Sequence, residues 1–270
     1  MGSRKCDRSL PIKQGWILDE FNELMKWPLR SSLLCLVLLS VHSYADTEPA
    51  ELSVGLNLSL DFQSYKGREM ETSVLPTAFY DGDLLYAEGD QAGLNLYRDT
   101  KNKLRLYAYY DGTMYHPSGS LSQLDERQWS VLVGTSYMYT SDYGAFKLSA
   151  AQDILSRSRG AIANLSYIAA WETGSWTLYP ELGLQWNSSK YNQYYFGVSS
   201  EESKRSGIKS YQLDSGVYPY AGLAVDYELN KHWNIYTTYK VNYLSDDQYQ
   251  SPMTKKRVEF EPGFGVNYTF

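Results

Sequence analysis

The last fourteen residues of the chain alternate between apolar side chains and polar side chains or glycine. The apolar set is Val258, Phe260, Pro262, Phe264, Val266, Tyr268 and Phe270, and the intervening set is Arg257, Glu259, Glu261, Gly263, Gly265, Asn267 and Thr269. Successive side chains of a β-strand point to opposite faces, so one face of this segment is apolar. Such a strand invites aggregation at the edge of a soluble sheet, whereas a closed membrane barrel turns its apolar face to lipid. The pattern therefore favours a membrane β-barrel.

The same alternation recurs along most of the chain, in segments of about ten residues, the length that a tilted membrane strand needs. The clearest segments are 52–63, 129–139, 176–187, 217–229 and 233–243, and weaker ones cover 73–80, 83–88, 91–98, 103–112, 144–153 and 160–172. Together with 257–270 they predict an all-β fold, an antiparallel transmembrane β-barrel of twelve strands, or of ten if the short early segments merge. Trp176 and Trp186 share one face of a strand, as expected for aromatic girdles at both membrane interfaces.

The predicted connections alternate in length. One set consists of short turns, at 81–82, 99–102, 141–143, 174 and 230–231. The other set is mostly long, at 64–72, 113–126, 154–159, 188–216 and 245–256, with 89–90 as the exception. Bacterial outer-membrane barrels have short periplasmic turns and longer extracellular loops. The pattern therefore predicts that both termini of the barrel lie in the periplasm and that the long loops face outside.

A cleavable signal peptide is predicted at residues 25–45. A short basic start precedes an apolar run of eleven residues at 31–41, and 43–45 form a small-x-small cleavage site. Residues 1–24 are then expected to be an upstream extension from a mis-called start, and 46–270 to be the outer-membrane barrel. The alternative is a cytoplasmic anchor followed by a transmembrane helix, but eleven residues are too few to span a bilayer.

Composition narrows the chemistry of the mature chain. Cys6 and Cys35 precede the cleavage site, so disulfides, thiol catalysis and cysteine-based metal sites are excluded after cleavage. Acidic side chains outnumber basic ones, 31 to 25 over the whole chain, which argues against nucleic acid as a partner. His116 and His232 are the histidines that follow residue 45, and two distant histidines do not make a transition-metal site.

Calcium held by loop carboxylates is a further alternative. The adjacent acidic pairs of the predicted long loops are Asp125-Glu126, Glu201-Glu202 and Asp246-Asp247. None of them has the alternating ligand spacing of a calcium loop. We therefore expect no metal and no cofactor.

One short motif favours catalysis. His116-Pro117-Ser118 resembles the His-x-Ser that outer-membrane phospholipases and lipid A deacylases place on a barrel face, where histidine acts as the base for serine. The surrounding Pro, Gly and Ser residues are ordinary loop composition, and Pro117 weakens the strand that would bring the two side chains onto one face. The sequence therefore predicts that the chain is not an enzyme.

The longest predicted loop, 188–216, contains a helix signal. Ser199 is followed by Glu202 three residues later, which is a capping box, and Gly207 stands where a helix commonly ends. These residues predict a short helix over 200–206. It could be a lid, a constriction or a binding surface, or it could simply order a long loop.

The same loop carries a family resemblance. The matching residues are Tyr195-Phe196-Gly197-Val198-Ser199, Glu201-Glu202, Ser206-Gly207 and Tyr211. They resemble the "YYGVSPEEA…SGLPAY" stretch of the MipA/OmpV family, the MltA-interacting protein and its relatives, and Ser200 stands where the family usually has proline. Trp176, Pro180 and Leu184 before the loop agree as well, and the resemblance extends over essentially the whole mature chain.

The resemblance implies a multi-pass barrel of the bacterial outer membrane, surrounded by outer-membrane lipid, with no catalytic residues to transfer. It also implies a non-catalytic scaffold that joins a lytic transglycosylase to a penicillin-binding murein synthase. Relatives discussed as adhesins, osmotic-response porins or antibiotic-linked channels supply the alternative of a small-solute pore or a surface adhesin. The long outer loops favour that alternative, because the short periplasmic turns offer little surface compared with the roughly 800 Å² per partner of a standard interface. The candidate interaction loop comprises Tyr195, Phe196, Gly197, Val198, Ser199, Glu201, Glu202, Gly207 and Tyr211.

The terminal segment is predicted to be the twelfth strand, which closes the barrel against residues 52–62. Its lipid-facing aromatic residues include Phe264, Tyr268 and Phe270. The terminal aromatic Phe270 also resembles the signal that the barrel-assembly machinery reads. We therefore expect these residues to serve barrel closure and assembly.

Overall fold

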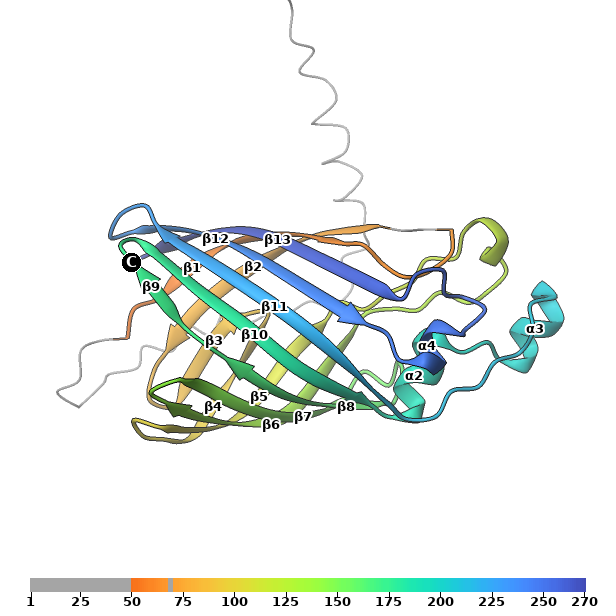
Figure 1. The fold of residues 1–270 in the computed structure, drawn as a ribbon, viewed down its shortest axis with the longest axis horizontal. Helices are drawn as coiled ribbons and strands as arrows, with labels where there is room; N and C mark the ends of the chain where they lie inside the picture. The colour runs from red at the N-terminus through yellow and green to blue at the C-terminus, as the bar shows by residue number, and fades with distance from the viewer. Residues whose placement is uncertain (1–49, 68–69) are drawn as a thin grey trace, which may run out of the picture. The chain divides into compact units, whose positions relative to one another are not determined.

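The computed structural model describes residues 50–67 and 70–270, and they form a closed antiparallel barrel (Figure 1). The predicted extension 1–24 and signal peptide 25–45 lie outside the described residues. The strands are β1 (Ser53–Asp61), β2 (Glu71–Asp81), β3 (Leu85–Gly89), β4 (Gln91–Arg98), β5 (Asn102–Asp111), β6 (Ser130–Ser141), β7 (Gly144–Asp153), β8 (Ala161–Ile168), β9 (Trp171–Thr173), β10 (Trp176–Asn187), β11 (Gly216–Glu228), β12 (Trp233–Tyr243) and β13 (Val258–Thr269). β8 pairs with residues 181–187 of β10 and β9 pairs with residues 176–178 of the same strand, so β8 and β9 are two pieces of one strand. The barrel therefore has the predicted twelve strands.

The terminal strand closes the barrel, as its alternation predicts. β13 pairs with β12 on one side and with β1 on the other, where Ser53 lies opposite Thr269 and Ser59 opposite Gly263. Each remaining strand pairs with its neighbours in chain order, and β10 pairs with β11 to complete the ring. Closure leaves no free sheet edge, which is the condition for a sheet to exist in lipid.

The outward face of the wall is apolar and exposed. Leucines of β1 and β10, such as Leu56, Leu58, Leu182 and Leu184, and Phe264 of β13 are all exposed large hydrophobic side chains. The predicted girdle residues Trp176 and Trp186 are exposed on the same wall. A ring of exposed aliphatic side chains is unfavourable in water and stable in contact with lipid. None of the helices in the described residues is long and apolar enough to cross a membrane.

The inward face is filled in part by tyrosines that lie over glycines. Tyr220 of β11 pairs with Gly183 of β10, and a Cβ at Gly183 would come within 2.4 Å of the Tyr220 ring. Tyr236 of β12 pairs with Gly265 of β13 in the same way, at 2.1 Å. Glycine therefore alternates with apolar residues in these strands because a tyrosine from the next strand takes the space of its missing side chain.

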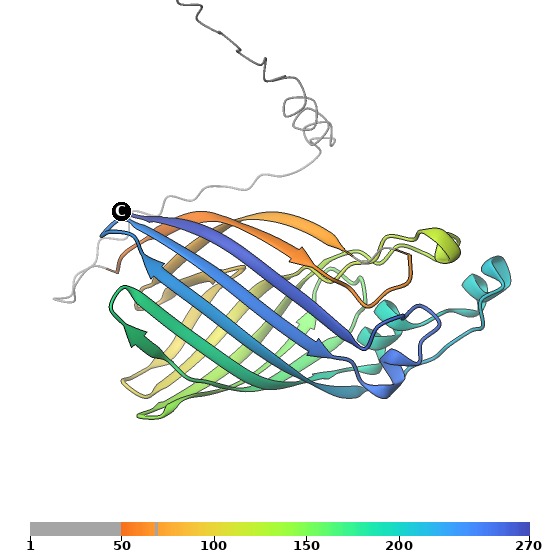
Figure 2. The ribbon, with the colours of Figure 1, turned by 45° about the horizontal axis from the view of Figure 1, so that its top comes forward.

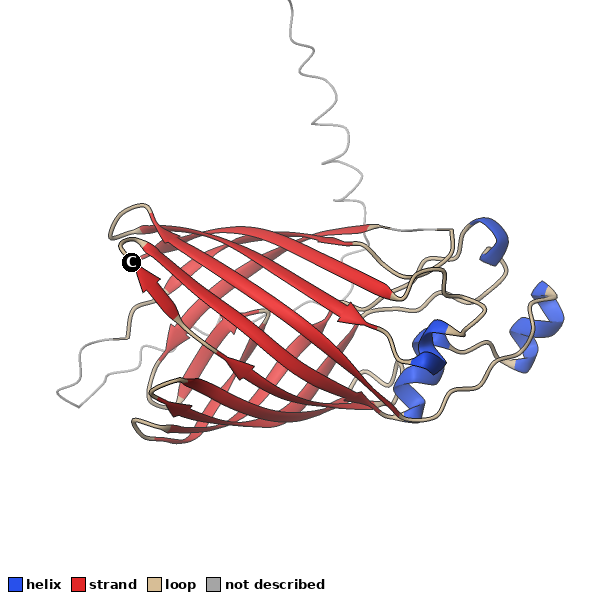
Figure 3. Cartoon of the chain, in the orientation of Figure 1, coloured by secondary structure: helices blue, strands red, loops and turns tan. Residues whose placement is uncertain are grey.

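The two rims of the barrel differ. One rim, next to the C-terminus, carries the short turns of residues 82–84, 99–101, 142–143, 174–175 and 229–232 (Figure 2). The other rim carries the long connections and all the helices of the described residues: η1 (Gly119–Leu121), α2 (Ser189–Phe196), α3 (Ser200–Ser206) and α4 (Asp246–Tyr249) (Figure 3). The predicted helix over 200–206 is confirmed as α3, with both halves of its capping box formed and Gly207 at φ 73°. The sequence did not predict α2 or α4.

Candidate functional sites at the two rims of the barrel

Helix α2 lies across the mouth of the barrel at the long-loop rim. It enters from β10, where the Ala161 N–H at the start of β8 donates to the Ser188 hydroxyl at 2.8 Å. The other hydrogen-bond partners of α2 come from well-separated parts of the ring. They lie after β1, at the end of β5, before β6 and between β12 and β13. These hydrogen bonds are Tyr191–Asp111 (2.9 Å), Tyr195–Gln128 (3.2 Å), Tyr65–Tyr195 (3.1 Å) and Ser251–Phe196 (2.5 Å). A short helix that reaches all of these segments must cover the opening between them.

An apolar cluster holds the long loops together. We call the described residues 62–67, 112–129, 188–215 and 244–257 the loop cap. Its buried members include Tyr65, Tyr115, Tyr195, Phe196, Val198, Leu244 and Met253. The ring centroids of Tyr65 lie 4.7 Å from Tyr115 and 5.7 Å from Phe196. Because these side chains come from all four loops, the loop cap is a small hydrophobic core of its own.

Helix α3 is anchored to the loop cap by one carboxylate. Glu202 is buried, and its Oε1 accepts from Arg127 Nη2 at 2.7 Å and from the Asp125 N–H at 2.9 Å. Its Oε2 accepts from the Ser199 N–H at 2.8 Å. Burial alone would raise the pKa of Glu202, but the N–H groups of Ser199 and Asp125 and the guanidinium of Arg127 hold it below its usual range. Glu202 is therefore an ionised structural residue at neutral pH.

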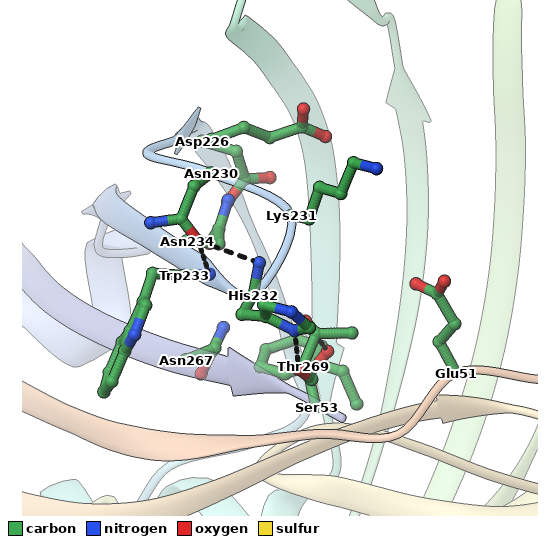
Figure 4. A pocket seen from close by; sticks show the side chains of 12 residues that line it. Glu51, Ser53, Asp226, Asn230, Lys231, His232, Trp233, Asn234, Asn267 and Thr269 are labelled. Carbon is green, nitrogen blue, oxygen red and sulfur yellow. Dashed lines mark hydrogen bonds between the residues drawn. The ribbon is translucent and has the colours of Figure 1, made fainter.

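The opposite rim carries a polar recess of about 330 Å³ next to the C-terminus (Figure 4). The turn between β11 and β12 forms one wall, where Asn230 Oδ1 accepts from the N–H groups of His232 and Trp233. His232 Nδ1 lies 3.0 Å from the Thr269 carbonyl oxygen, so this nitrogen carries the proton, and the Thr269 N–H donates to the His232 carbonyl. These bonds fix the turn against the end of β13.

The charged lining of this recess is mostly acidic and unpaired. Glu51, Asp226 and Glu228 line it together with Lys231. Within residues 50–67 and 70–270, none of the three carboxylates forms an ion pair. Trp233, which lines the recess, is an exposed aromatic. An aromatic next to unpaired carboxylates is suited to binding a basic group of another molecule.

Comparison with known proteins decides the family. The family model described as "MltA-interacting protein MipA" matches residues 54–270. The chain belongs to this family. The MltA-interacting protein of Escherichia coli (strain K12) is 29% identical over 238 residues, which are 87% of this chain and 96% of the relative. The putative outer membrane protein YiaT of the same strain is 29% identical over 230 residues, 84% of this chain and 94% of the relative.

More distant relatives agree with the outer-membrane location. OmpV of Vibrio cholerae serotype O1 is 26% identical over 187 residues, 67% of this chain and 72% of the relative, and is named an outer membrane protein. Among solved structures, an outer membrane channel from Pseudomonas putida F1 aligns with this chain at 8% sequence identity and a TM-score of 0.47. The aligned region covers 85% of this chain and 98% of the channel. The family model and the named relatives show that this chain is a MipA/OmpV-type β-barrel of the outer membrane. These relatives are named as an interacting protein or as outer membrane proteins rather than as enzymes.

The residues of the MipA family motif are mostly inside the loop cap. Tyr195, Phe196, Gly197, Val198 and Glu202 are buried, and Ser199 serves as the N-cap of α3. Only Glu201 and Gly207 are exposed, and the half-buried Tyr211 pairs with Val198 and donates from its hydroxyl to the Asp247 carbonyl. The motif thus builds the loop cap, and its role as an interaction loop stays a prediction.

The predicted assembly residues lie on or beyond β13. Phe264 is exposed on the outer wall. Tyr268 stacks with His232 at 5.6 Å between ring centroids and contacts Phe270 edge-on at 5.1 Å. The Phe270 N–H donates to the Leu52 carbonyl at 3.1 Å, so the last residue extends the pairing of β13 with the segment before β1. Their role in barrel assembly stays a prediction.

The His-x-Ser motif of this MipA family member does not form a catalytic pair. His116 Nδ1 lies 3.0 Å from Glu71 Oε1, and His116 Nε2 lies 3.2 Å from Glu126 Oε1. The hydroxyl of Ser118 is buried and has no hydrogen-bond partner among the residues that the structure describes. Both ring nitrogens therefore face carboxylates rather than the serine. Elsewhere in the described ranges, 50–67 and 70–270, no cluster of three or more His, Cys, Asp or Glu residues is arranged to hold a metal ion.

Proposed function

We propose that this chain is a non-catalytic scaffold that holds peptidoglycan-remodelling enzymes at the periplasmic face of the outer membrane. The partner is a lytic transglycosylase of the MltA type, and a penicillin-binding murein synthase is the second partner that the family resemblance implies. The support from comparison is the name of relatives that are 29% identical over nearly their whole length. The proposal places the short-turn rim and the C-terminus in the periplasm, in line with the short periplasmic turns of outer-membrane barrels.

The observation that carries the proposal is the contrast between the two rims. At the long-loop rim, the loops bury their apolar side chains against one another and α2 lies across the mouth. At the short-turn rim, the recess exposes the aromatic Trp233 and leaves three carboxylates with no ion-pair partner among residues 50–67 and 70–270. Peptidoglycan enzymes work in the periplasm, so they would meet the short-turn rim. The recess gives that rim the concave anchor point that a set of short turns alone would lack.

Site-specific photo-crosslinking tests this proposal. The full-length barrel in a lipid nanodisc is mixed with the purified MltA-type transglycosylase of the same organism, with the crosslinking residue at Lys231 in the recess or at Lys204 on α3. Both lysines are exposed, so the two positions are matched. We expect a crosslink from Lys231 and none from Lys204. A crosslink from Lys204 alone, or no complex at either position, would overturn the scaffold proposal.

A small-solute pore is the second candidate, and one observation favours it. Charged side chains of the inner wall, including Asp61, Lys240 and Glu261, are only half-buried, so the lumen below the loop cap holds accessible polar space. Solutes would pass if the loop cap moved aside. If the protein is a scaffold and not a pore, the intact protein should give no steady conductance in a planar bilayer. Steady open channels would support the pore instead, and adhesion of the intact protein to host surfaces would support a surface adhesin.

A further inference from the structure

The connection between β7 and β8, residues 154–160, is held in one shape by a single carboxylate. Asp153 Oδ1 accepts from the Ser130 hydroxyl at 2.5 Å and from the Leu155 N–H at 2.9 Å. Its Oδ2 accepts from the Ser158 N–H at 2.7 Å and from the Arg159 N–H at 2.8 Å. A loop of this length with its backbone donors bound to one buried group is pre-organised rather than adaptable.

The same loop carries backbone strain. Ser156 has φ 59° and Arg159 has φ 53°, and they are the non-glycine residues with positive φ in the described ranges. The left-handed region is unfavourable for residues with a Cβ, and such strain gathers where a protein must hold a particular shape. Glycine has no Cβ and would adopt these φ values without strain. The sequence has serine and arginine at these positions.

The loop presents aliphatic and cationic side chains side by side. Ile154 and Leu155 are 55% and 41% exposed. The Ile154 N–H donates to the Val131 carbonyl, so it continues the ladder of β7, and its side chain extends the lipid-facing wall. Arg157 and Arg159 are exposed directly after these residues. At this point of the long-loop rim, the apolar outer wall of the barrel therefore lies next to two positive charges.

These two arginines differ from the other arginines of residues 50–67 and 70–270. Arg98 and Arg105 pair with Asp81. At the long-loop rim, the paired arginines are Arg127 with Glu202, Arg205 with Asp125 and Arg257 with Asp246. In the part of the chain that the structure describes, Arg157 and Arg159 are the arginines without a carboxylate partner or any side-chain hydrogen bond. The rigid loop thus displays two guanidinium groups that nothing in the described protein neutralises.

We propose that residues 154–159 form a binding site for a phosphorylated glycolipid of the outer leaflet. Arg157 and Arg159 bind its phosphate through charge-assisted hydrogen bonds, for which the planar guanidinium is well suited. Ile154 and Leu155 contact its acyl chains. The exposed Trp129 directly precedes β6, two residues before Val131, the partner of Ile154, and so lies at the same rim. A soluble anion would not account for the exposed aliphatic residues, whereas an anionic lipid accounts for both halves of the surface. The inference rests on the orientation given in the proposed function.

The test measures binding of lipid A, as the phosphorylated glycolipid, to the full-length protein in detergent by native mass spectrometry. The R157Q/R159N variant removes both charges, with asparagine at residue 159 because it tolerates positive φ. The control variant K204Q/K209Q removes two exposed charges from the same rim. We expect affinity for lipid A to fall at least tenfold in R157Q/R159N and less than twofold in K204Q/K209Q. Equal binding by R157Q/R159N and the unmodified protein, or an equal loss in both variants, would overturn the proposal.

Two further arms separate the lipid from other ligands. Dephosphorylated lipid A should bind at least tenfold more weakly to the unmodified protein, and the I154Q variant should weaken binding of lipid A severalfold. If the deacylated phosphosugar binds as tightly as lipid A, the site recognises a soluble phosphate and the lipid proposal fails. Heat-modifiable mobility confirms that each variant is a folded barrel. A Lys231 crosslink together with unchanged lipid binding by R157Q/R159N would overturn this inference alone and leave the scaffold intact.

Discussion

Arg127 and Glu202 form a buried ion pair although 75 residues separate them in the chain, with Nη2 2.7 Å from Oε1. The same guanidinium donates to the Gly197 carbonyl at 3.2 Å, and the same carboxylate accepts from the backbone of both loops. The pair therefore joins the β5–β6 connection to α3, and the contact with Gly197 joins the same connection to the segment between α2 and α3. It is the main polar link that keeps α3 on the loop cap.

Removal of one partner of this pair should loosen the loop cap without unfolding the barrel. In R127A, Glu202 keeps a buried charge with no cation, and breaking a buried pair in this way costs about 3–5 kcal/mol. We expect faster proteolytic cleavage in residues 197–215 and unchanged heat-modifiable mobility of the barrel. Limited proteolysis of the protein in detergent measures the rate of cleavage, and gel mobility with and without heating shows whether the barrel is folded.

R205A is the matched control. Arg205 also pairs with a carboxylate of the β5–β6 connection, Asp125, but the two side chains are 48% and 62% exposed. Exposed pairs contribute about 0–1 kcal/mol, so R205A should be cleaved at nearly the unmodified rate. Equal protection of R127A and R205A would show that the loop cap does not depend on the buried pair.

The loop cap should also loosen at acid pH. Because the folded state holds the pKa of Glu202 below the ordinary 4.5, the carboxylate stabilises the loop cap fully above pH 4.5, and this contribution is lost as the pH falls below that value. Hydrogen exchange of the Ser199 and Asp125 amides, corrected for the intrinsic pH dependence, should therefore accelerate below pH 4.5. E202Q has no charge to lose at this position. If its exchange changes with pH as steeply as that of the unmodified protein, Glu202 is not the titrating group.

The strands could be predicted from the sequence because lipid imposes its constraint on every second residue. The predicted segment 233–243 matches β12, and 257–270 differs from β13 by one residue at each end. Helix α3 was also predictable, since its capping box involves Ser199 and Glu202, which lie within one turn. Such local and periodic signals do not depend on how the loops meet.

The loop cap could not be predicted because its contacts join distant segments. Nothing in Tyr195 or Phe196 indicates that their partners are Gln128, Tyr65 and Ser251. Two local signals were nevertheless readable. Ser188 caps α2, and Ser245 with Gln248 forms a second capping box, for α4. The recess at the short-turn rim had no sequence signal, since its carboxylates come from β11 and from the segment before β1.

A side chain at Gly183 should destabilise the barrel, because the Tyr220 ring occupies its space. In G183A the new Cβ would come within 2.4 Å of that ring, and displacement of Tyr220 would also break its 2.8 Å hydrogen bond to Glu181. We expect a loss of about 1–3 kcal/mol, as is typical of overpacking, seen as a lower thermal midpoint of heat-modifiable mobility. G222A is the control, because its Cβ would meet Glu181 at an ordinary 3.5 Å. Equal midpoints for G183A and G222A would contradict the packing argument.

Deletion of Phe270 should impair assembly of the barrel more than its stability. The side chain is 72% exposed and contacts the edge of the Tyr268 ring, so its loss removes little packing from the folded wall. The resemblance to an assembly signal predicts instead that fewer chains reach the membrane as folded barrel. The amount of heat-modifiable barrel in isolated outer membranes measures assembly, and the thermal midpoint of the purified barrel measures stability. We expect a severalfold drop in the amount of heat-modifiable barrel and a nearly unchanged thermal midpoint.

F146A, which removes another exposed aromatic from the wall, is the control and should assemble normally. Normal barrel levels after deletion of Phe270, or an equal drop in F146A, would show that the terminal aromatic has no special role in assembly.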